Sequence, residues 1–158
     1  MNFQNDLNAY IRAGYPLIYV SALEPERAIS SIEKVCDSIN DGLSCHIWKN
    51  TTGWDNTGNG DDPDEIFECI DRRQTPNAVS VLCNYHAYIG ENPNPVLVQQ
   101  FMDSYFKWKT AENHRTVIVL SPFYKMAPEL ERFFQTINYT LPETEQIEKI
   151  VDSIASAY

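Results

Sequence analysis

Residues 16–23, PLIYVSAL, are a short, uninterrupted apolar run that is rich in β-forming residues. A strand that is covered by protein on both faces carries such a run, because neither face meets water. Helical spacing of apolar residues appears on both sides of it, within an N-terminal segment over residues 1–15 and again from Pro25 onward. The stretch therefore predicts a buried strand between two helices.

The same alternation of strand and helix continues along the chain. Four further apolar runs are typical of strands, over residues 43–49, 78–85, 116–120 and 136–141. Strands that read as apolar blocks and alternate with helices indicate a mostly parallel sheet between two helical layers. We therefore expect an α/β fold, a three-layer α/β/α sandwich with a mostly parallel five-stranded sheet, in a single domain over residues 1–158. A last helix is expected over residues 143–158.

Composition and charge narrow the class of protein. Of the 158 residues, 43% are hydrophobic and 22% are charged, as in ordinary globular domains, and the net charge is −10. A negative charge of this size repels nucleic-acid backbones and anionic membranes, so neither is expected as a partner. The sequence shows no membrane-spanning apolar run, no signal peptide and no CxxC pair of cysteines, which favours a cytoplasmic protein.

Several segments together resemble one family. They are LNAYIRAGYPLIYVSAL (7–23), VLCNYHAYI (81–89), RTVIVLSP (115–122) and YTLPETEQI (139–147). Taken in this order, they are similar to the N-terminal domain of AAA ATPases of the cyanobacterial and plastid reading-frame type, which also occur in other bacteria and in phages. One departure is at residues 84–86, where the family commonly has Asp-Phe-His and this chain has Asn-Tyr-His.

The resemblance implies a degenerate AAA-like domain of P-loop NTPase topology that precedes a separate, intact ATPase module. ATP and Mg²⁺ would then be cofactors of that second module alone, and no cofactor is expected for this chain. Nothing in the 158 residues resembles the second module. The chain is therefore interpreted either as an N-terminal fragment or as a free-standing version of the domain, and residues 143–158 as the possible start of a lid subdomain.

The residues at the expected phosphate-binding turn fit this interpretation. A P-loop reads GxxxxGK[ST], because glycines let backbone N–H groups surround the phosphates and the lysine neutralises their charge. Residues 21–27 read SALEPER, with no glycine and no lysine. Pro25 lacks an N–H donor, and Glu24 and Glu26 would repel a triphosphate at the start of the helix.

The metal-binding half of the site is also missing. An acidic pair should follow the third strand to hold Mg²⁺ and activate water, and the chain has Asn84 and Tyr85 there. We therefore expect no ATP hydrolysis by this chain, although the related family is one of ATPases. The degenerate nucleotide-site positions are Ser21, Glu24, Glu26, Asn84, Tyr85 and Ser121.

A binding cleft at Asn84, His86 and Ser121 is the alternative use of this sheet edge, where α/β folds place ligands. The sequence supplies neither a nucleophile elbow nor a carboxylate to orient His86, so local hydrogen bonding is the plainer interpretation. No metal site is expected, because Cys83 and His86 lie at i and i+3 and point to opposite faces of a strand.

Two other groups of residues invite a functional interpretation. Arg72, Arg73 and Arg115 lie at the ends of elements and could reach a neighbouring subunit, although surface ion pairs explain such arginines more often. The aromatic residues Phe123 and Tyr124 could anchor a partner, with partial burial as the equal alternative.

The leading hypothesis is a non-catalytic domain that docks with or regulates an AAA ATPase module or another protein, with a homo-oligomer left open. The alternatives are a stand-alone acidic adaptor and a domain that binds a nucleotide or small molecule in the cleft at Asn84, His86 and Ser121.

Overall fold

The structure, a computed structural model, describes residues 2–40, 42–139 and 154–155. Its sheet has the strand order β3-β2-β4-β5-β1-β6, and every neighbouring pair is parallel except β2 and β3. The strands are β1 (Leu17–Ala22), β2 (Cys45–Lys49), β3 (Gly53–Trp54), β4 (Val79–Cys83), β5 (Thr116–Ser121) and β6 (Gln135–Tyr139). The mostly parallel sheet is confirmed, with six strands where the sequence analysis expected five.

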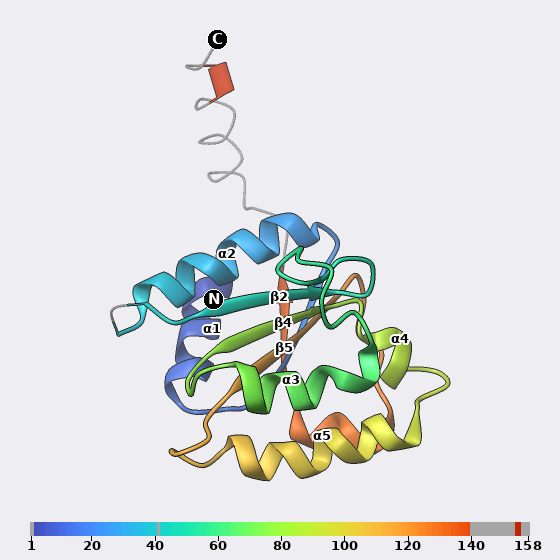
Figure 1. Ribbon diagram of the computed structural model, residues 1–158. Coiled ribbons are helices and arrows are strands. Elements are labelled where there is room, and N and C mark those ends of the chain that lie inside the picture. The colour runs from blue at the N-terminus through green and yellow to red at the C-terminus, as the bar shows by residue number, and fades with distance from the viewer. Residues whose placement is uncertain (1, 41, 140–153, 156–158) are drawn as a thin grey trace.

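Helices cover both faces of this sheet, so the three-layer sandwich is confirmed (Figure 1). One face packs against α1 (Phe3–Arg12) and α2 (Pro25–Ser38). The other face packs against η1 (Pro63–Glu65), α3 (Ile66–Arg73), α4 (His86–Ile89), α5 (Pro95–Trp108) and η2 (Pro128–Phe133). The helix predicted over residues 143–158 lies outside the described residues, apart from 154–155.

The interior strand β1 shows why its sequence is a continuous apolar run. Ile18 and Val20 belong to the core beside α1 and α2, whereas Leu17 and Tyr19 belong to the core on the opposite face. Successive side chains of a strand point to opposite faces, and here both faces are dry. β1 lies between β5 and β6, which places its carboxyl end next to theirs.

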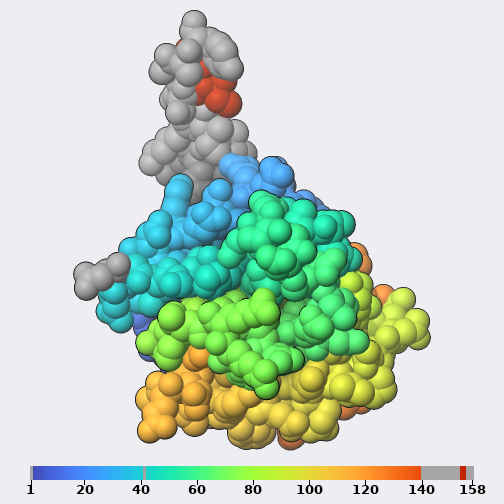
Figure 2. Space-filling view, in the orientation of Figure 1, coloured from blue at the N-terminus to red at the C-terminus, as the bar shows by residue number. Residues whose placement is uncertain are grey.

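The extra strand β3 lies in a polar, glycine-rich segment, GWDNTGNGDD over residues 53–62, for which the sequence analysis predicted no strand. Gly53 has a φ of +67°, a conformation that glycine adopts without strain. The chain then closes back on itself, because the Trp54 N–H donates to the Asn59 carbonyl at 2.9 Å. Figure 2 shows this loop and α3 side by side on the surface, and Asn59, Glu65 and Cys69 line one shallow pocket between them.

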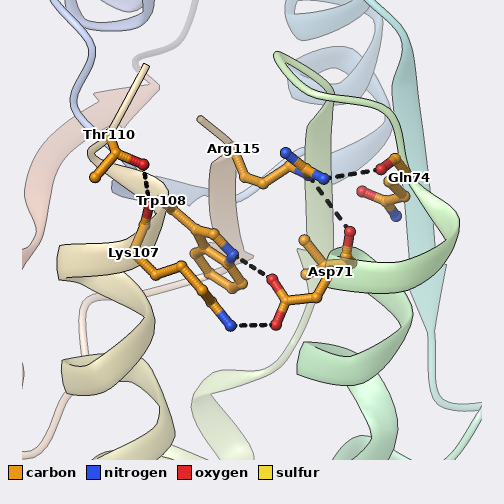
Figure 3. Close-up of polar contacts among 7 residues, drawn as sticks. Asp71, Gln74, Lys107, Trp108, Thr110 and Arg115 are labelled. Carbon is orange, nitrogen blue, oxygen red and sulfur yellow. Dashed lines mark hydrogen bonds and ion pairs between the residues drawn. The ribbon is translucent and has the colours of Figure 1, made fainter. Parts of the chain in front are cut away.

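Arg115 is a buried cation that fixes the end of α3 (Figure 3). Only 5% of the residue is exposed. Its guanidinium donates to the carbonyl oxygens of Gln74 at 2.9 Å, His114 at 3.1 Å and Ile70 at 3.4 Å. The Ile70 and Gln74 carbonyls would otherwise lack this donor in the interior, whereas the His114 carbonyl also accepts the Asn77 N–H at 2.8 Å. The prediction of an arginine at the surface is therefore wrong for Arg115, and it cannot reach a neighbouring subunit.

A second contact joins α3 to α5. The Asp71 carboxylate accepts hydrogen bonds from the Trp108 indole at 2.8 Å and from the Lys107 ammonium (Figure 3). Arg72 does form a surface ion pair, with Glu68 at 2.8 Å. The Asp71 contacts therefore tie α3 to α5 within the helical layer that also contains α4.

Candidate functional site

The carboxyl ends of β1, β4, β5 and β6 form the sheet edge where a P-loop protein would bind phosphate. The turn after β1 leads directly into α2, whose first residue is Pro25. Glu24 precedes the helix without capping it and pairs with Arg27 at 2.9 Å. Glu26 places a second carboxylate in the first turn. The positive end of the helix is thus already matched by negative side chains.

A small pocket lies beside this turn, with a volume of about 250 Å³. Its lining is formed by Ser21, Ala22, Leu23, Glu24, Pro122, Asn138 and Tyr139. At its base the Ser21 hydroxyl donates to the Asn138 side-chain oxygen at 2.6 Å, joining β1 to β6. The Ser21 hydroxyl at the end of β1 is therefore engaged within the protein.

Ser121, at the end of β5, is buried and fully engaged as well. Its hydroxyl donates to the Phe123 carbonyl at 2.5 Å and lies 2.6 Å from the Tyr19 hydroxyl. Tyr19 also donates to that carbonyl at 2.8 Å and accepts the N–H of Lys125 at 3.1 Å. Burial raises the pKa of Tyr19, more than these hydrogen bonds lower it, which keeps the phenol neutral.

Asn84 and Tyr85, which follow β4, point in different directions. Asn84 is exposed, has a φ of +58° and donates its N–H to the Leu120 carbonyl at 2.7 Å. Tyr85 is buried in the core, where its hydroxyl donates to the Pro63 carbonyl at 2.8 Å. Burial raises the pKa of Tyr85 far above its ordinary value. Its side chain therefore supports α4 and η1 and is not available at the sheet edge.

His86 begins α4 and lies under Phe123, with the two ring centroids 5.1 Å apart and the rings nearly perpendicular. Its Nδ1 atom is buried without a hydrogen-bond partner among the described residues. Burial, with a smaller contribution from the Lys125 ammonium, lowers the pKa of His86. No described carboxylate hydrogen-bonds to Nδ1, so nothing fixes the ring orientation and tautomer of His86 in the way that general bases are usually held.

An apolar surface surrounds these engaged polar groups. Leu23 is 77% exposed, Phe123 51% and Tyr124 44%. The Tyr124 ring rests edge-on against Tyr19, with centroids 5.0 Å apart. We call Leu23, Phe123 and Tyr124 the edge patch. It occupies the sheet edge at which a nucleotide site would be expected.

The chemistry that this edge can perform is limited. Among residues 2–40, 42–139 and 154–155, no three His, Cys, Asp or Glu side chains are grouped so that they could hold a metal ion. Nor does any helix in this part of the chain combine the length and apolar character needed to cross a membrane.

Comparison with known families agrees with this geometry. The family model described as "SpoVK-like AAA ATPase, N-terminal domain" matches residues 3–139, which is most of the chain. The chain belongs to the family of SpoVK-like AAA ATPase N-terminal domains. A search of curated proteins finds no match to it. The resemblance seen in the sequence, to an N-terminal domain of AAA-type ATPases, is thereby confirmed.

The structure of this SpoVK-like domain also shows what sequence reasoning missed. Tyr19 was assigned only to a strand, yet its hydroxyl organises the end of β5, because it meets a serine 102 residues further along the chain. Leu23 carried no signal beyond its place next to the strand. The exposure of Leu23 depends on how α2 and the loop after β5 pack around it, and the local sequence does not give that packing.

Proposed function

We propose that this chain is a non-catalytic docking or regulatory domain that acts on the ATPase module of a SpoVK-like AAA ATPase or on another protein partner. One observation carries the proposal: both serine hydroxyls at the nucleotide edge are engaged internally. Ser21 bonds to Asn138, and Ser121 bonds to Tyr19 and the Phe123 carbonyl. A phosphate would have to break these contacts before it could make its own.

Electrostatics supports the same proposal. Glu24 and Glu26 occupy the start of α2, and Pro25 offers no N–H there. Two carboxylates beside a triphosphate repel it, and the charge of −10 on the chain adds to this repulsion at long range. The four cysteines are free thiols, which suits the cytosol that we propose as the place of action.

The experiment measures ATP turnover by a purified ATPase module of the same family, with and without this chain. The chain alone should release no phosphate, and an excess of it should bind the module and change the rate at which the module hydrolyses ATP. A catalytically inactive chain that neither binds the module nor alters its turnover would contradict the docking role on that partner. Phosphate release by the chain alone would contradict the non-catalytic assignment.

A further inference from the structure

We propose that the pocket beside β1 and the edge patch together bind a segment of a partner protein that carries both basic and apolar side chains. An arginine or lysine of the partner would enter the pocket, and its apolar side chains would contact the edge patch. The proposal deepens the proposed function and rests on it. It assigns the lost nucleotide site to a different ligand class, a positively charged peptide surface.

The walls of the pocket fit the stem of a long side chain. Ala22, Leu23 and Pro122 supply apolar contacts in a volume of about 250 Å³. Arginine and lysine bury an aliphatic stem along such a surface while their charged head stays polar or wet. The Glu24 carboxylate lies in the lining of the same pocket, where it can meet that head.

The carboxylates around the pocket determine which charge the partner segment must carry. Glu24 is paired with Arg27, but both side chains are more than a third exposed, so the pair is weak and can exchange partners. Glu26 has no ion-pair partner among the described residues. The turn therefore offers two carboxylates against one arginine, and an acidic or phosphate-bearing partner would be repelled.

The edge patch supplies the apolar part of the contact. Leu23 belongs to the pocket lining as well as to the patch, and Phe123 directly follows Pro122 of that lining. The patch and the pocket thus share Leu23 and are joined through the Pro122–Phe123 peptide. Aromatic and apolar anchors next to a charged pocket are the usual make-up of an interface centre.

A second exposed apolar pair gives a matched control. Val96 and Phe106 on α5 are 65% and 64% exposed. Beside Phe106, Lys109 lies over the Tyr105 ring and Arg132 over the Phe133 ring. The α5 surface has similar exposure but carries cations, so a basic segment should avoid it.

The test uses fluorescence anisotropy and amide NMR with three labelled peptides of equal length, built from Leu and Arg, from Leu and Glu, and from Gly and Arg. Only the Leu/Arg peptide should bind specifically, with shifts centred on residues 21–24 and 122–124. The variant L23S/F123S should lose about tenfold or more in affinity. The control V96S/F106S should change it less than about twofold.

A second pair of variants tests the charge. E24Q/E26Q should weaken Leu/Arg binding and flatten its salt dependence, whereas D61N/E112Q, with the same change in net charge, should leave both nearly unchanged. All eight substituted residues are exposed, and circular dichroism confirms that each variant folds.

Other outcomes overturn the inference. It fails if no peptide binds, if the Gly/Arg or Leu/Glu peptide binds equally well, or if the shifts map to α5. None of these results would contradict the proposed docking function, because the domain could dock through another surface. Micromolar binding of Mg-ATP at the same residues would instead remove the proposed function itself.

Discussion

A single buried hydroxyl group, that of Tyr19, organises the sheet edge at the carboxyl end of β5. The Tyr19 hydroxyl makes three polar contacts, to Ser121, the Phe123 carbonyl and the Lys125 N–H. They shape the loop that carries Phe123 and Tyr124. A core tyrosine thus positions a surface loop through atoms far away in the sequence, and its loss should affect stability more than its size suggests.

Tyr19→Phe should lower the free energy of unfolding by about 1–3 kcal/mol, because it leaves buried polar partners unsatisfied. The matched control is Tyr88→Phe, whose hydroxyl accepts only an exposed contact from Asn50 at 3.2 Å and should cost less than about 0.5 kcal/mol. Urea denaturation measures both. Equal losses for the two variants would show that the Tyr19 network does not stabilise the loop.

Arg115→Met should destabilise the domain by roughly 2–4 kcal/mol, because the carbonyls of Ile70 and Gln74 lose their donor in the interior. Arg72→Met, which removes an exposed pair with Glu68, should cost less than about 0.5 kcal/mol. Thermal and urea unfolding of both variants compare the two positions. An Arg115 variant as stable as the Arg72 variant would contradict the anchoring role.

His86 should make stability depend on pH. Its pKa is lowered in the folded state from the ordinary value of 6.5, mainly by burial. As the pH falls below about 6.5 the unfolded chain takes up the proton first, so stability falls until the folded pKa is reached. Above that window the protonation of His86 contributes nothing.

The measurement compares the urea midpoint at about pH 7.5 and about pH 5 for the wild type and for His86→Gln. The wild type should lose more stability between the two than the variant does, and NMR titration of the ring should give a midpoint below 6.5. A midpoint at or above that value would show that the ring is not buried beneath Phe123.

At the scale of elements, much of the fold follows from the sequence because its strands are buried on both faces. β1 and β5 are apolar at nearly every position. They show neither helical spacing of apolar residues nor a run of turn-forming residues, so a buried strand is the natural prediction for both. The two-residue β3 was missed, since a strand that short has no period. Tyr85 was placed at the site although its side chain packs in the core, because residue number alone does not give side-chain direction.

The loop that forms β3 depends on Gly53. A Cβ atom there would collide with the backbone of Asn59, and φ is +67°. Gly53→Ala should therefore cost about 2 kcal/mol or more. Gly58 has a similar φ of +78° but open space around it, so Gly58→Ala should cost only about 1 kcal/mol. Equal losses in chemical denaturation would contradict the close approach of residues 53 and 59.

For the whole molecule, the chain has the family and the α/β fold of an AAA ATPase N-terminal domain, and we propose that its sheet edge serves for docking. The family description places the domain in AAA ATPases, and the order of the parallel strands places β1 between β5 and β6. Yet the turn after β1 carries carboxylates, and the neighbouring hydroxyls are bonded internally. We propose that the scaffold is kept here without a working nucleotide site, so that the fold alone does not give the function.

The most direct test of this account is isothermal titration of the purified chain with Mg-ATP and Mg-ADP, with phosphate release assayed on the same sample. The account predicts no binding heat and no phosphate release at nucleotide concentrations up to the millimolar range. Micromolar binding, with NMR shifts at Ser21, Asn84 or Ser121, would show that a phosphate site exists without a P-loop and would contradict the central claim.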